Sequence, residues 1–136
     1  MIFDVLTQRL VDKGLGVPGE SIFHNFMGAE VMRGVMFRTP LTGIPVDPYI
    51  EGRHSADIQV ITRHTDPVEG MNLANAVSRA LVLESPRVFE IAGNRIQVSI
   101  IYPKTMPIQF PRLEGNNLEF SQHFFTVFAM KPLWRD

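Results

Sequence analysis

The sequence contains no cysteine, which excludes disulfide bonds and thiolate chemistry. It has no run approaching the ~20 apolar residues that a membrane-spanning helix needs, and its start lacks the basic residues and continuous apolar stretch of a secretion signal. Charge of neither sign is in excess, because 13 basic and 14 acidic residues give a net charge of −1. Neither nucleic-acid binding nor an acidic tail is indicated. We therefore expect a soluble protein made in a cytoplasm, with no membrane partner.

Motifs for catalysis, metal binding and phosphate binding are missing as well. The histidines do not have the spacing of metal ligands, and no serine lies in a Gly-x-Ser-x-Gly motif. His54 with Asp57, or His64 with Asp66, are spaced to form an acid–base pair. The competing interpretation is a strand-end histidine in water and a helix N-cap, because Asp66 directly precedes a helical pattern. We therefore expect no catalytic residues, no cofactor and no metal.

What the sequence does contain predicts one globular domain over residues 1–136. Apolar residues make up 45% and charged residues 20%, close to the usual balance. Apolar periodicity predicts helices over residues 2–13 and 67–84, and strands over residues 56–63 and 118–130. The fold class that we expect is α+β, with a mixed, mainly antiparallel sheet packed against two main helices and a long Pro/Gly-rich arm.

The second helix has the clearest local signals. Asp66 is a good N-cap, Pro67 suits the first helical position, and Glu69 stands at the spacing of a capping box. The face predicted to pack on the sheet is mostly small and aliphatic. Its residues are Leu73, Ala74, Val77, Ala80, Leu81 and Glu84.

A first hairpin is predicted to join residues 21–27 to residues 30–37. A two-residue turn between them would place Ile22 opposite Val35. Polar and apolar residues alternate only weakly here, because phenylalanines and methionines load the second face. This pattern indicates burial on both sides, or one face covered by a partner chain.

A second hairpin is predicted to join residues 88–92 to residues 95–102 through a turn at residues 93–94. That turn would place Phe89 opposite Val98 on the core side. The last strand has apolar residues on both faces, which indicates an interior strand. The three that share one face are Phe120, Phe124 and Phe128.

Residues 38–55 form a Pro- and Gly-rich arm. Prolines remove donors from a sheet ladder, and a loop longer than ~12–15 residues is usually functional or disordered. Apolar side chains in the arm would be stabilised if a neighbour covered them: Ile44, Val46, Tyr49 and Ile50. Arginines lie at strand ends and in the arm, facing either solvent or a channel or acidic neighbour: Arg33, Arg38, Arg53 and Arg63.

The order of helix, hairpin, Pro-rich arm, strand, helix, hairpin and final strand resembles that of the tail terminator (tail completion) proteins of long-tailed bacteriophages. It is similar also to the minor capsid and neck proteins grouped with them. The local match lies in the strand DIQVITR at residues 57–63 and in the alanine-rich helix that follows it, with Gly70, Ala74, Ala76, Val77 and Leu81. The strand at residues 120–128 fits the closing strand of the family.

The resemblance implies a structural virion protein without enzymatic activity. Such proteins form rings, commonly hexamers, that cap the finished tail tube, stop its polymerisation and join the tail to the head connector. The implied partners are further copies of this chain, the tail tube protein and the head–tail connector protein, with DNA passing through the ring without specific binding. The implied location is the tail–neck junction of the virion.

A ring of this kind closes by heterologous contacts, in which one face of each subunit meets a different face of the next. The arm and one strand-end arginine are the candidate subunit or partner interface. The residues are Arg38, Ile44, Val46, Tyr49, Ile50, Arg53 and Arg63. The prolines of the arm lower the entropic cost of ordering it on binding.

Three other functions stay open on the sequence alone. One is a head–tail neck or minor capsid subunit of similar fold. Another is a small hydrolase or thioesterase that uses His24, His54 or Asp57. The third is a small-molecule-binding domain, for which a ligand would raise the melting temperature.

Overall fold

The computed structural model describes residues 2–110 and 117–132. Along this part of the chain the elements are α1 (Ile2–Asp12), β1 (Ile22–His24), β2 (Gly34–Arg38), β3 (Arg53–His64), α2 (Pro67–Leu81), β4 (Arg87–Ile91), β5 (Asn94–Pro103), β6 (Ile108–Gln109) and β7 (Leu118–Pro132). The strands form one sheet in the order β1-β2-β3-β7-β5-β4, and β6 also pairs with β7. Every pair except β1–β2 is antiparallel. The predicted α+β class with a mixed, mainly antiparallel sheet is therefore confirmed.

Strand β7 lies in the interior of the sheet, as its sequence predicts. It pairs with β3 along the full length of β3, and on its other edge with β5 and β6. Phe120, Phe124 and Phe128 point to the core side and are buried. Because both edges of β7 are paired, this strand ties the two halves of the sheet together.

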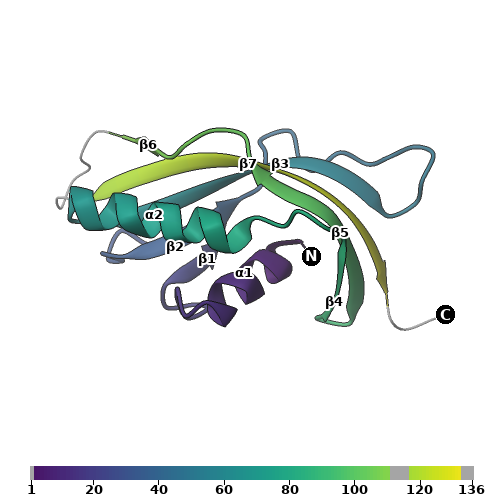
Figure 1. Cartoon of the computed structure of the whole chain (residues 1–136), viewed down its shortest axis with the longest axis horizontal. Coiled ribbons are helices and arrows are strands. Elements are labelled where there is room, and N and C mark those ends of the chain that lie inside the picture. The colour runs from purple at the N-terminus through teal and green to yellow at the C-terminus, as the bar shows by residue number, and fades with distance from the viewer. Residues whose placement is uncertain (1, 111–116, 133–136) are drawn as a thin grey trace.

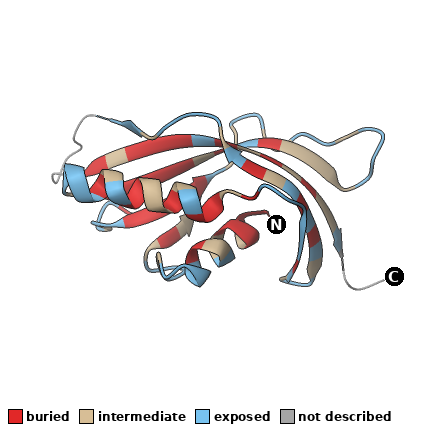
Figure 2. Ribbon diagram, in the orientation of Figure 1, coloured by how far each residue is buried: buried red, intermediate tan, exposed pale blue. Residues whose placement is uncertain are grey.

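Both helices cover the same face of the sheet, which curves over them (Figure 1). Their inward faces are buried, and Figure 2 shows the buried residues concentrated between helices and strands. The core there includes Ile2, Val5 and Leu10 of α1 and Val77 and Leu81 of α2. No helix among residues 2–110 and 117–132 combines the length and apolar content needed to cross a membrane.

Helix α2 begins where its sequence predicts. The Oδ1 atom of Asp66 accepts hydrogen bonds from the backbone N–H groups of Val68 (2.8 Å) and Glu69 (2.9 Å), which completes the N-cap. The N–H of Asp66 itself donates to Nδ1 of His64 at 3.0 Å. The histidine thus takes the place that the Glu69 carboxylate has in a capping box.

The same helix ends at Leu81 rather than at residue 84 as predicted. Leu83 exchanges two backbone hydrogen bonds with Ile101 of β5, at 2.9 and 3.0 Å, so the chain is already extended there. Arg9 of α1 donates from its guanidinium to two carbonyls at the end of α2, at 3.0 and 2.8 Å. These carbonyls lack a partner within their own helix, and a cation suits the negative end of the helix dipole.

The predicted hairpin of residues 21–27 and 30–37 is wrong. Ile22 does lie opposite Val35, but β1 and β2 run parallel. Parallel neighbours need a connection longer than a two-residue turn, and residues 25–33, which we call the outer loop, supply it.

The β4–β5 hairpin forms as predicted, but its register differs by two residues. Phe89 lies opposite Ile96 rather than Val98. The turn uses Ala92 and Gly93, whose φ angles of 53° and 76° are those of a type I′ turn. A shift of two residues keeps every side chain on its face, so Phe89 and Val98 are both buried as predicted.

Candidate functional site

The arm between β2 and β3 is shorter than predicted, running over residues 39–52 rather than 38–55. Arg38 is the exposed last residue of β2, and Arg53 already pairs with Ala129. The difference arises because β7 is long enough to extend the ladder of β3. Residues 39–52, called the arm from here on, project beyond the sheet and away from α1 (Figure 1).

The tip of the arm is folded around the carboxylate of Asp47. Its Oδ1 atom accepts hydrogen bonds from the N–H groups of Tyr49 (2.8 Å) and Ile50 (3.1 Å), and Oδ2 lies 3.2 Å from Nη1 of Arg53. The two N–H groups, Tyr49 first, and the guanidinium hold the pKa of Asp47 below its usual range. An aspartate that binds the backbone two residues on defines a local turn, so the tip is organised by its own residues.

The root of the arm is fixed to the sheet. The carbonyl of Gly52 accepts from the N–H of Met130 at 2.9 Å. Gly52 has a φ of +77°, and a Cβ there would stand 2.6 Å from the Met130 carbonyl oxygen, so only glycine fits. Nδ1 of His54 lies 2.8 Å from the carbonyl of Pro45, and Ile44 packs against the main core.

Between these fixed points the arm displays apolar side chains to water. The exposed fractions are 98% for Leu41, 76% for Val46, 93% for Tyr49 and 54% for Ile50. Covering such side chains is the main driving force for protein association, and an aromatic ring on an ordered turn loses little conformational entropy when bound. Ile44, in contrast, is turned toward the core, and Leu41 was missed by the sequence prediction.

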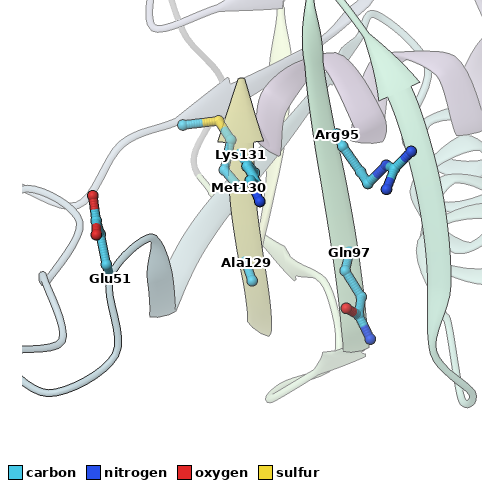
Figure 3. A pocket seen from close by; sticks show the side chains of 6 residues that line it. All are labelled: Glu51, Arg95, Gln97, Ala129, Met130 and Lys131. Atoms are coloured by element: carbon cyan, nitrogen blue, oxygen red, sulfur yellow. The ribbon is translucent and has the colours of Figure 1, made fainter. Parts of the chain in front are cut away.

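A groove of about 500 Å³ adjoins the root of the arm. Figure 3 shows its lining: Glu51 comes from the arm, Arg95 and Gln97 from β5, and Ala129, Met130 and Lys131 from β7. Arg95 forms an ion pair with Glu90 of β4 at 3.1 Å. The groove therefore carries charges of both signs beside the apolar arm, an arrangement typical of the polar rim of an interface.

Residues 9–127 match the family model described as bacteriophage tail terminator protein. The match includes the arm, α2 and most of the sheet. The chain belongs to the bacteriophage tail terminator family. This is a family of structural virion proteins rather than enzymes, so the resemblance seen in the sequence is confirmed. No curated protein sequence matches the chain.

Arg63 lies inside this tail terminator subunit, although the sequence suggested that it contacts a partner. It is 8% exposed. Its Nη2 atom lies 3.0 Å from Oε2 of Glu119, and Nη1 donates to the carbonyls of Gly28 (2.6 Å) and Val31 (3.1 Å) in the outer loop. Arg63 therefore holds its own subunit together, and its contact with a neighbour stays a prediction.

The residues considered for a hydrolase make separate contacts in this tail terminator. Nε2 of His24 shares a hydrogen bond with Oγ1 of Thr7 at 2.8 Å, and burial lowers the pKa of this histidine. Asp57 forms an ion pair with Lys104 at 3.2 Å, while His54 serves the root of the arm. Among residues 2–110 and 117–132, no three His, Asp or Glu side chains are grouped to hold a metal ion.

Proposed function

We propose that this chain forms a ring of six identical subunits that caps the tail tube, stops its polymerisation and joins the tail to the head connector. The observation that carries the proposal is the arm, which is ordered at root and tip, apolar and exposed in a member of the tail terminator family. The mechanism is steric, because a ring seated on the growing end leaves no surface to which another tube subunit can bind.

The chemistry of the arm supports an assembly role. Its prolines and its internal hydrogen bonds restrict the free chain, so little entropy is lost when it is ordered against a partner. A net charge of −1 supports a lumen through which DNA passes without specific binding, because strong binding to phosphates needs many Lys and Arg contacts. The position in the virion would then be the tail–neck junction.

The test is to measure the mass of the purified chain by light scattering and to image the same sample by negative stain, alone and after adding purified tail tubes. We expect rings in solution, or rings on the ends of the tubes, and tubes that stop elongating. A chain that stays monomeric in both samples and leaves tube growth unchanged would contradict the proposal.

A matched pair of double variants tests whether the arm is needed for capping of the tail tube. The double substitution Val46→Ser and Ile50→Ser removes two exposed apolar side chains from the arm, and we expect it to abolish capping. The control, Val68→Ser and Val88→Ser, removes two exposed valines from α2 and β4, and we expect it to cap tubes normally. Equal loss in both double variants would show that the arm has no special role.

A further inference from the structure

The subunit exposes a second apolar feature, a groove between α1 and β1. This α1 groove has a volume of about 660 Å³. Its apolar lining consists of Val11, Ile22, Phe23, Phe26 and Ile91, and α1 supplies a polar rim that includes Thr7 and Gln8. Phe26 is 76% exposed, which is unusual for a phenylalanine in a single subunit.

We propose that Tyr49, at the tip of the arm of one subunit, inserts into the α1 groove of a neighbouring copy of this chain. This inference rests on the ring in the proposed function and names the two surfaces that would meet in it. The arm would act as the knob of a heterologous contact, and the α1 groove as its socket.

Both surfaces are fixed before they meet. On the arm, Asp47 sets the turn that presents Tyr49. In the α1 groove, Phe26 follows Asn25, which has a φ of 64°. The N–H of Asn25 donates to the Phe37 carbonyl at 2.8 Å, and its side-chain oxygen accepts from the N–H after Arg38 at 2.8 Å. Two preorganised apolar surfaces lose little entropy on contact.

The chemistry of the α1 groove suits a tyrosine. Its apolar floor would cover the ring of Tyr49, while the phenol hydroxyl needs a hydrogen-bond partner once it is buried. The rim offers such partners, because Thr7 Oγ1 and His24 Nε2 already share a hydrogen bond of 2.8 Å at its edge and Gln8 lies beside them.

The arm projects beyond the sheet and away from α1 (Figure 1), so the occupant of the α1 groove would come from another copy. Every copy carries one knob and one socket on different faces, which is what closure of a ring requires. Tyr49 and Phe26 together would remove roughly 300–500 Å² from water, a fraction of the ~1,600 Å² of a standard interface. The contact is therefore an anchor within a larger interface between subunits.

Cysteine crosslinking provides the test, because the natural chain contains no cysteine. Ile50→Cys combined with Val11→Cys leaves Tyr49 and Phe26 in place. Under oxidation of assembled rings we expect a ladder of crosslinked species up to the full ring. The control combines Ile50→Cys with Val68→Cys, which lies 67% exposed at the start of α2, and should give monomers.

Alanine variants give a second readout. Tyr49→Ala and Phe26→Ala should each raise the concentration at which rings assemble at least about tenfold, with Tyr49→Phe in between and melting temperatures unchanged. Rings that form at the normal concentration in both alanine variants, or that crosslink only in the control pair, would overturn this inference and leave the proposed ring standing. If the natural chain forms no ring alone or on tubes, the proposed function and this inference fail together.

Discussion

The outer loop and the arm flank the same strand, β2, but only the outer loop contributes a buried apolar side chain, Met27. The outer loop, residues 25–33, folds over the sheet face opposite the helices, where Met27 packs with Met36 and Ile61. The arm leaves apolar side chains of similar size in water. The outer loop thus buries Met27 while exposing Phe26 and Met32, whereas Ile44 is the one large apolar side chain of the arm that packs on the core.

The two loops differ in how an arginine of β3 binds each of them. Arg63 bonds to carbonyls of the outer loop from a buried position within the sheet and pairs with Glu119 of β7. Arg53 has a side chain that is 40% exposed and pairs with Asp47 in the arm itself. Both arginines belong to β3, but they bind different groups. The buried Arg63 holds the backbone of the outer loop against the sheet, whereas the half-exposed Arg53 binds one side chain, Asp47, and shapes only the tip of the arm.

The largest expected effect on the free energy of unfolding comes from replacing Arg63 by methionine, and the same substitution at Arg53 provides the comparison. Arg63→Met should lower the free energy of unfolding by about 2–3 kcal/mol, because Glu119 and two loop carbonyls lose a buried partner. Arg53→Met should change it by less than about 1 kcal/mol, as expected for an exposed pair. Urea denaturation of both variants measures the contrast, and equal losses would contradict this comparison.

The sequence predicted elements whose signals are local. Asp66 and Pro67 identified the start of α2, because cap and helix are adjacent in the chain. The turn of the β4–β5 hairpin was misplaced by one residue because Ala92, rather than Asn94, has the positive φ. Phe89 nevertheless kept its face, since the resulting register shift is even.

The parallel β1–β2 pair was not predictable in the same way. The loop between these two strands is held by Arg63, which donates to the Gly28 carbonyl and pairs with Glu119, 56 residues away in the sequence. In the candidate site, Val46, Tyr49 and Ile50 are exposed, and their role as an interface stays a prediction. The turn that presents them was missed, although an aspartate before a proline is a readable turn signal.

A smaller effect is expected at the start of the outer loop, where His24 ends β1. Burial lowers the pKa of His24, while Asp4 acts in the opposite direction. As the pH falls below the ordinary histidine pKa of about 6.5, the unfolded chain therefore takes up this proton first, and stability is lost. His24→Gln should lose less stability than the natural chain between pH 7.5 and pH 5.5 in parallel urea titrations. An identical pH dependence in the two proteins would exclude His24 as a contributor.

The smallest effect on stability is expected for the turn at the tip of the arm, where a substitution should change local hydrogen exchange but not the melting temperature. Asp47→Ala removes the acceptor of the Tyr49 and Ile50 N–H groups, but no core residue moves, so the melting temperature should stay unchanged. Hydrogen exchange of these two amides should become faster, because their bonds are lost while the root at Gly52 persists. The matched change Asp57→Ala removes an exposed ion pair outside the arm and should leave exchange in the arm as it was. A fall in melting temperature for Asp47→Ala would show that the arm, like the outer loop, is part of the cooperative core.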